Sequence, residues 1–126
     1  MKEFEKWFRK AENDLLVIKN NLASEEIPID ACCFHAQQAA EKYMKAYLVS
    51  RLVNFPKTHD LQSLLNLCIA INYSFNSIIE PCLRLSDFAI APRYPDAFDD
   101  LTIDDAMNAQ KDAIEIKEFV LKNFFN

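Results

Sequence analysis

The chain has 126 residues, of which 51% are apolar and 26% are charged, and it contains no glycine. A chain of this length buries roughly two-thirds of the surface that it exposes when unfolded, so we expect a single domain over residues 1–126. Tight hairpins and phosphate-binding loops depend on glycine, and its absence argues against β-rich folds, P-loops and dinucleotide-binding folds. The composition therefore predicts an all-α protein.

The net charge of −5 is concentrated toward the C-terminus, because residues 1–93 carry 11 basic and 11 acidic side chains whereas residues 94–126 carry 3 and 8. An acidic chain argues against sequence-independent binding to duplex DNA but leaves room for a small basic site. No apolar run approaches the ~20 residues of a membrane span, and the charged start lacks the apolar core of a signal peptide. We therefore expect a cytoplasmic protein.

The four cysteines lie within helical patterns and have no disulfide-framework spacing, which predicts small buried side chains: Cys32, Cys33, Cys68 and Cys82. Cys32 and His35 are one helical turn apart, but no second CxxC or HxxxH accompanies them, so no zinc site is expected. Neither histidine has a Glu three residues before it, which excludes a di-iron bundle. We expect no metal and no cofactor.

The first predicted helix spans about residues 2–23, with apolar side chains at steps of three and four. A break at residues 24–28 precedes a second helix that ends near residue 52 and carries many alanines. Small side chains let helix axes approach closely, so this helix is expected at the centre of the bundle. His35, Gln38, Lys42 and Lys45 follow a different face of it. This polar stripe is either a solvated surface or a place where a partner or ligand binds.

Three further helices are expected. Thr58 is a good N-cap for one that runs to about residue 71 and has His59 in its first turn, where His59 is either a capping group or a site residue. After a loop at 72–76, Ser77 and Glu80 form a capping box for a helix to about residue 89. Thr102 and Asp105 begin a long amphipathic helix that reaches the C-terminus. The pattern predicts an up-and-down helical bundle of about five helices, three long and two short.

The stretch "APRYPDAF", residues 91–98, interrupts this helical pattern. Pro92 and Pro95 bias the residues before them away from helical dihedrals, so the segment is expected to be a stiff, extended crossing. Arg93 offers a planar fork of donors suited to a phosphate or a carboxylate, and Tyr94 can stack on a base. Alternatively, Arg93 pairs with a nearby aspartate while Tyr94 packs inward.

Several segments together carry a family resemblance. "CFHAQQAAEKYMKAYLV" at 33–49 is followed by "KTHDLQSLL" at 57–65 and "RYPD" at 93–96, and Trp7, Ala11, Asp14 and Leu15 precede them. In this order, over almost the whole chain, they closely resemble the HEPN domain family of bacteria and archaea. The resemblance implies a helical bundle that commonly dimerises, is often encoded beside a minimal nucleotidyltransferase, and was originally proposed to bind nucleotides.

Many HEPN proteins are metal-independent ribonucleases and toxins that use an arginine followed four to six residues later by a histidine, paired with the same residues of a second subunit. In such chemistry histidine moves a proton at the ribose 2′-hydroxyl and arginine stabilises the phosphorane. This sequence keeps Arg93 but has no histidine at that spacing. His35 or His59 would have to replace it from elsewhere in the fold.

The sequence therefore favours a non-catalytic HEPN homodimer that binds a nucleotide or a nucleotide-bearing partner and acts with a nucleotidyltransferase in a toxin–antitoxin-like pair. The alanine-rich stripe and the many aromatic residues of so small a domain also favour the dimer. Arg93 and Tyr94 are the expected nucleotide-binding residues. The secondary candidates are basic residues of the other two motif segments: Lys42, Lys45, Lys57 and His59. A ribonuclease that uses Arg93 with His59 or His35 is one alternative. A bundle that only binds other proteins is the other.

Overall fold

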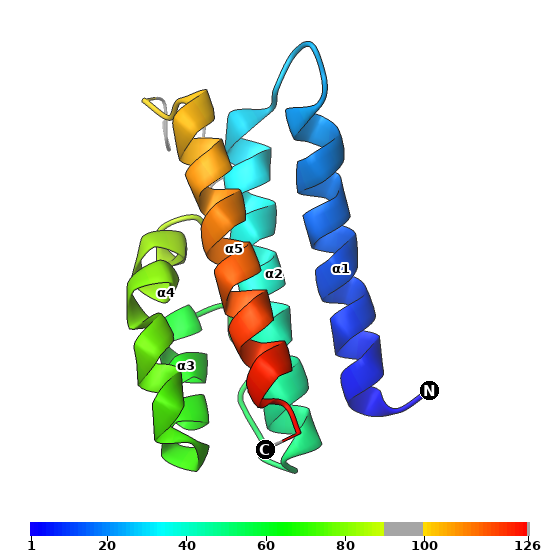
Figure 1. Cartoon of the computed structure of the whole chain (residues 1–126), viewed down its shortest axis with the longest axis vertical. Helices are drawn as coiled ribbons and strands as arrows, with labels where there is room; N and C mark the ends of the chain where they lie inside the picture. The colour runs from blue at the N-terminus through cyan, green and yellow to red at the C-terminus, as the bar shows by residue number, and fades with distance from the viewer. Residues whose placement is uncertain (90–99, 126) are drawn as a thin grey trace.

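In a computed structural model, residues 1–89 and 100–125 are described, and over these ranges the chain forms five α-helices, one 3₁₀-helix and no strand. The predicted all-α bundle of three long and two short helices is confirmed (Figure 1). The elements in chain order are α1 (Glu3–Leu22), α2 (Ile29–Ser50), α3 (Leu61–Ile71), the 3₁₀-helix η1 (Tyr73–Ile78), α4 (Ile79–Ser86) and α5 (Ile103–Asn123).

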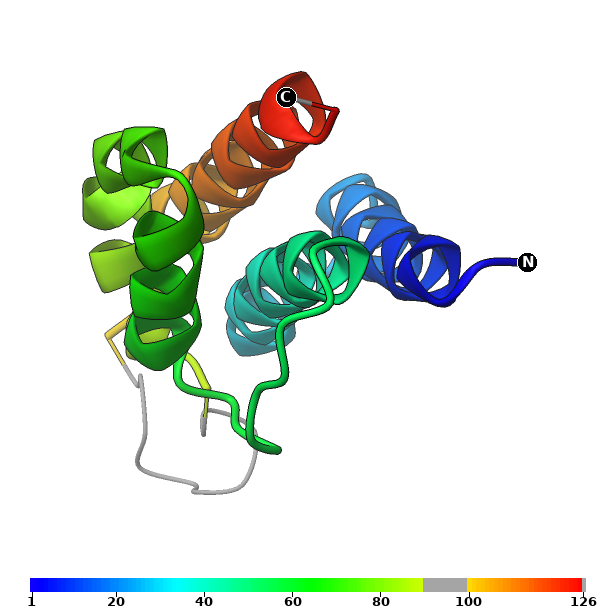
Figure 2. The same ribbon diagram turned by 90° about the horizontal axis from the view of Figure 1, so that it is seen from below.

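The long helices α1, α2 and α5 run side by side, and the short pair α3 and α4 packs against α2 and α5 (Figure 2). Helix α2 is central, as its small side chains predict, because it contacts all four other α-helices. Ala36, Ala39 and Ala40 are completely buried and allow these close approaches. The alanine-rich stripe is therefore used inside one chain, and it does not form the dimer surface that its composition suggested.

Aromatic side chains fill the core where the first turns of α1 meet the last turns of α5. The Phe124 ring lies 4.9 Å from that of Phe4 and 5.0 Å from that of Phe8, measured between centroids. Tyr47 of α2 packs on Phe75 of η1 at 4.5 Å. Aromatic pairs at these distances stabilise the fold by more free energy than the burial of their apolar area alone provides. The aromatic residues of this small chain thus join both ends of the sequence to α2.

The end of α2 is set by a left-handed residue. Leu52 has φ 58°, the amide of Leu52 donates to the carbonyl of Val49 at 3.0 Å, and the amide of Val53 donates to Leu48 at 3.0 Å. This pair of bonds is a Schellman motif, in which glycine usually occupies the left-handed position. The chain has no glycine, so an exposed leucine takes that conformation, and the helix ends two residues before the predicted boundary.

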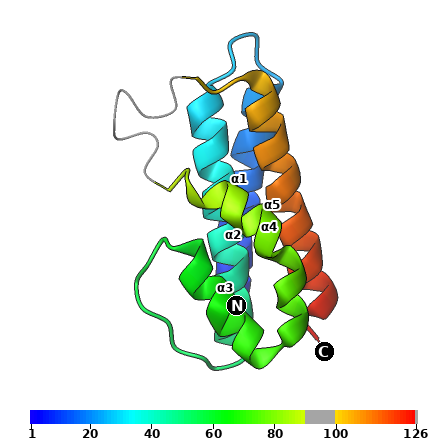
Figure 3. The same cartoon turned by 90° about the vertical axis from the view of Figure 1, so that its left-hand side faces the viewer.

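Two predicted helix starts are wrong. Asp60, not Thr58, is the N-cap of α3, because its side chain accepts from the amide of Gln62, while Thr58 Oγ1 accepts from the amide of Asp60 at 3.0 Å. His59 therefore precedes the helix. Helix α4 continues directly from η1, so Ser77 and Glu80 form no capping box, and it ends at Ser86 rather than near residue 89 (Figure 3).

The predicted start of α5 is confirmed. The amide of Asp105 donates to Thr102 Oγ1 at 3.3 Å, and the amide of Thr102 donates to Asp105 Oδ2 at 2.8 Å, which together make a capping box. The proline-flanked stretch at 91–98 lies outside the described residues.

Candidate functional site

The polar stripe of α2 lies between two neighbouring elements. His35, Gln38, Lys42 and Lys45 occur at steps of three and four and so share one face of the helix, which we call the α2 polar face. Asp14 of α1 binds side chains along one edge of this face, and His59, just before α3, reaches the other edge through Glu41. The face is therefore neither a freely solvated surface nor a bare basic patch.

At the first edge, Asp14 holds a histidine and a lysine together. His35 Nδ1 lies 2.8 Å from Asp14 Oδ1, and Lys42 Nζ lies 2.6 Å from Asp14 Oδ2. An ionised carboxylate only accepts hydrogen bonds, so the proton of the neutral imidazole is on Nδ1 and Nε2 is left as the basic atom. The His35 side chain is 31% exposed, whereas Asp14 is buried. This cluster joins α1 to α2 and presents a partly accessible imidazole.

At the second edge, Glu41 has the same kind of partners. His59 Nδ1 lies 2.8 Å from Glu41 Oε1, and Lys45 Nζ lies 3.0 Å from Glu41 Oε2. Gln37 Nε2 also donates to the His59 carbonyl at 2.8 Å, which fixes the backbone of this residue. The His59 side chain is 63% exposed although its carboxylate partner is buried. Glu41 thus orients an outward-facing imidazole on the segment before α3.

Both lysines of the α2 polar face are committed to carboxylates. Lys42 neutralises Asp14, while Lys45 neutralises Glu41 and also lies 5.3 Å from the centroid of the Trp7 ring, a cation–π contact. Each cluster is formally neutral when its imidazole is neutral and gains one positive charge when the imidazole is protonated. The formal charge of this face therefore depends on the histidines rather than on the lysines.

Several polar side chains away from the α2 polar face act in packing. Arg84 of α4 forms a two-pronged ion pair with the buried Asp112 of α5, with its Nε and its terminal nitrogen donating at 3.0 and 2.9 Å. Burial raises the pKa of the Cys33 and Cys82 thiols to about 12, so these cysteines are protonated, as expected for small buried side chains. Within residues 1–89 and 100–125 no three acidic, His or Cys side chains are grouped to hold a metal ion.

The family assignment comes from comparison with known domains. The family model for the HEPN domain matches residues 4–123, nearly the whole chain. The chain belongs to the HEPN family. This family contains proteins of the nuclease and toxin–antitoxin type, and its members often form dimers. Among the described helices of this HEPN chain, none has both the length and the apolar character that crossing a membrane requires.

Two solved structures resemble this HEPN domain over almost their full lengths. An archaeal HEPN homologue, ST0689, has a TM-score of 0.77 and 24% identity, with 98% of this chain and 99% of that chain covered. The protein TT1696 from Thermus thermophilus has a TM-score of 0.79 and 25% identity, with 97% and 98% covered. No curated protein matches the chain.

The predicted site residues fall into three groups in the HEPN fold. His35, Lys42, Lys45 and His59 lie at the α2 polar face, and Lys57 is exposed two residues before His59. Arg93 and Tyr94 lie outside the described residues. The sequence patterns assign no role to Asp14 or Glu41, which hold both histidines. A signal for Asp14 exists, because it falls between Ala11 and Ile18 on the buried face of α1, where an acid is unexpected.

Proposed function

We propose that this HEPN protein binds a nucleotide or an RNA phosphate at the α2 polar face and acts with a nucleotidyltransferase in a toxin–antitoxin-like pair. The observation that carries the proposal is that His35 and His59, the two histidines of the chain, are each held through Nδ1 by a buried carboxylate at opposite edges of one helix face. A carboxylate bonded to Nδ1 fixes the orientation of the imidazole and leaves the other ring nitrogen for a ligand.

Charge compensation supports an anionic ligand. Two uncompensated carboxylates beneath this face would repel a phosphate, but Lys42 and Lys45 neutralise them at 2.6 and 3.0 Å. A phosphate near His59 favours the protonated imidazole, whose Nε2–H then donates to a phosphate oxygen. Lys57 is exposed on the same short segment and adds a second positive charge. Arg93 and Tyr94 are proposed to contact the phosphate and the base.

Thermal unfolding with and without ATP tests this proposal. At a ligand concentration about tenfold above Kd, the wild-type chain gains about 1.4 kcal/mol, which raises the melting temperature by several degrees. The shift is expected to shrink in Lys57→Ala, His59→Gln and Arg93→Ala. Lys19→Ala removes an exposed lysine from the opposite side of α1 and is the matched control. The absence of a wild-type shift with ATP, GTP and short RNA at millimolar concentration contradicts the proposal.

A metal-independent ribonuclease is the second candidate, and the Asp14–His35 pair favours it. A carboxylate-held imidazole is suited to take the proton of a ribose 2′-hydroxyl as that oxygen attacks the adjacent phosphate. A second histidine returns a proton to the departing 5′-oxygen, which leaves a 2′,3′-cyclic phosphate. His35 and His59 would take these two roles, with Arg93 stabilising the charge on the phosphorane.

RNA cleavage in the presence of a metal chelator separates the two candidates. If the chain is a nuclease, His35→Ala and His59→Ala each lower the cleavage rate by about 10²–10⁴-fold while the circular dichroism spectrum stays helical. Wild-type protein that leaves tRNA, mRNA and short oligomers intact, yet shows the ATP-dependent stabilisation, supports binding alone. Association with a partner protein without either activity indicates a bundle that only binds proteins.

A further inference from the structure

Helix α5 exposes a row of large apolar side chains that nothing in the described part of this chain covers. Ile103, Met107, Ile114 and Leu121 are between 37% and 53% exposed, although an amphipathic helix is expected to bury such residues. Steps of four and seven residues place all four on one face of α5, which we call the α5 stripe. The buried face of α5 instead consists mainly of smaller residues such as Ala106, Ala113 and Val120.

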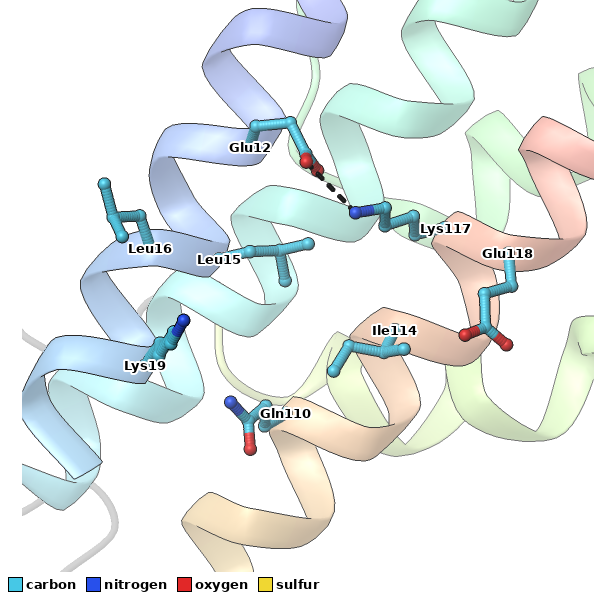
Figure 4. Close-up of a pocket in the computed structure, with 8 residues that line it drawn as sticks. All are labelled: Glu12, Leu15, Leu16, Lys19, Gln110, Ile114, Lys117 and Glu118. Atoms are coloured by element: carbon cyan, nitrogen blue, oxygen red, sulfur yellow. Dashed lines mark hydrogen bonds and ion pairs between the residues drawn. The ribbon is translucent and has the colours of Figure 1, made fainter. Parts of the chain in front are cut away.

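A groove beside the α5 stripe extends the same surface onto α1. It has a volume of about 370 Å³ and is lined by Leu15, Leu16 and Lys19 of α1 and by Gln110, Ile114 and Lys117 of α5, among others. Figure 4 shows Leu15 and Ile114 reaching into the gap between the two helices, with the Lys117–Glu12 ion pair at 3.0 Å across it. Leu16, which is 53% exposed, adds to the apolar wall. The groove has three apolar lining residues and five polar or charged ones, among them Glu12 and Glu118. An exposed apolar row beside such a groove is typical of a protein interface.

The charges beside the α5 stripe identify what covers it. Four exposed charged residues of α5 each come directly after a position on the face of the α5 stripe, where Gln110 also lies. They form a row along one edge of that face: Asp104, Lys111, Glu115 and Lys122. The charges along the row alternate between negative and positive. When the same row of a second copy runs in the opposite direction, each acidic residue lies opposite a basic one. The row is therefore complementary to itself when two copies of α5 pack antiparallel.

The register follows from the same residues. A two-fold axis that crosses α5 near its midpoint, at residues 112–113, places Ile103 opposite Leu121 of the second copy and Gln110 opposite Ile114. Along the charged row, Lys111 then lies opposite Glu115 of the second copy. The two-fold axis also places Glu115 opposite Lys111 of the second copy. A parallel arrangement would instead place the two charged rows on opposite edges of the contact, so that neither row would face its complement.

We infer that a second copy of this chain binds here, with α5 packed antiparallel against α5 and the groove between α1 and α5 at the interface. The helix of 21 residues is about 30 Å long, enough for an extended two-helix contact. This inference rests on the dimer that the family resemblance implies. It adds the surface through which the two copies bind. The α2 polar face opens on the other side of α1, toward the segment before α3, so the dimer leaves the proposed ligand site uncovered.

Light scattering at micromolar concentration tests the inference through charge exchange. The wild-type chain is expected to show twice the 14.6 kDa mass of one chain. Lys111→Glu or Glu115→Lys alone creates two like-charge pairs across the axis and weakens association about tenfold. Mixing the two variants pairs opposite charges at both positions and restores the dimer. A change confined to contacts within one helix cannot produce this recovery. Glu25→Lys, in the loop between α1 and α2, is the matched charge control.

Apolar substitutions provide an independent arm of the same experiment. Met107→Asp, at the most exposed position of the α5 stripe, is expected to give a folded monomer, whereas Leu83→Asp, a similarly exposed leucine on α4, leaves the mass unchanged. A monomeric wild-type chain overturns the inference, and so does a dimer that Met107→Asp or both charge reversals leave intact. Because ATP-dependent stabilisation is measured separately, a monomeric wild-type chain that still binds ATP refutes the interface and not the proposed ligand site.

Discussion

The Asp14 and Glu41 clusters have the same composition, one carboxylate with one lysine and one histidine, but differ in what they hold. Asp14 lies on α1 and binds two side chains of α2, so it joins two long helices. Glu41 binds Lys45 one turn along its own helix and His59 from the segment before α3. The first cluster thus holds packed helices together, whereas the second orients an exposed residue over a deeply buried ion pair.

This difference separates stability from site geometry. Glu41 and Lys45 are 3% and 7% exposed, compared with 9% and 19% for Asp14 and Lys42. A charge that loses its partner costs more where water reaches it less. The histidines show the opposite order of exposure, since His59 is twice as accessible as His35. We therefore expect carboxylate substitutions to affect mainly stability, and the His59 substitution to affect mainly ligand binding.

The largest effect is expected for Glu41→Gln, which leaves the buried Lys45 ammonium without its carboxylate. Breaking a buried pair in this way costs about 3 kcal/mol or more in the free energy of unfolding. Urea unfolding followed by circular dichroism measures the loss. The double variant Glu41→Gln/Lys45→Met removes both charges and is expected to recover much of it. No recovery would mean that the carboxylate acts through contacts other than the ion pair.

A smaller loss is expected for Asp14→Asn, about 2 kcal/mol, because Lys42 is more accessible to water and the asparagine oxygen still accepts one hydrogen bond. The same unfolding measurement applies, and Asn13→Ala on the exposed side of α1 is the matched control. Equal losses for Asp14→Asn and Glu41→Gln would break the distinction drawn between the two clusters.

His35→Gln is expected to cost about 1 kcal/mol, the usual contribution of one hydrogen bond, because it removes a link between α1 and α2. The loss should appear in urea unfolding and should be absent when Asp14 is already asparagine. If the two substitutions prove additive, His35 stabilises the fold independently of Asp14.

The smallest effect on stability is expected for His59→Gln, less than about 0.5 kcal/mol, because the ring is mostly exposed and surface ion pairs contribute little. Its ATP-dependent stabilisation should nevertheless fall more than that of His35→Gln. A variant that unfolds as readily as Glu41→Gln, or that keeps the full ATP response, would show that His59 serves packing rather than recognition.

Much of the fold could be predicted from periodicity and capping chemistry. Steps of three and four in apolar residues locate α1, α2 and α5, and the Thr102–Asp105 box locates the start of α5. The errors occur where local signals compete. Thr58 and Asp60 are both good N-caps within three residues, and only the packed position of the segment against Gln37 and Glu41 shows which one begins the helix.

The candidate site was predictable in its residue types but not in its partners. The resemblance to HEPN proteins and the polar stripe point to His35, Lys42, Lys45 and His59. Asp14 is 21 residues from His35 in the chain, and Glu41 is 18 residues from His59. No periodic pattern within one helix relates residues in different elements, so neither carboxylate could be assigned to its histidine.

The sequence by itself determined the helical class, the central position of the alanine-rich helix, and the family. These depend on local patterns, which hydrophobic spacing and small side chains express directly. Only the tertiary structure decided that Lys42 and Lys45 neutralise buried carboxylates, and that the apolar residues of α5 divide between a core face and an exposed stripe. Both depend on the distances between helices that are far apart in the chain, because burial and pairing are properties of the packed bundle rather than of any single segment.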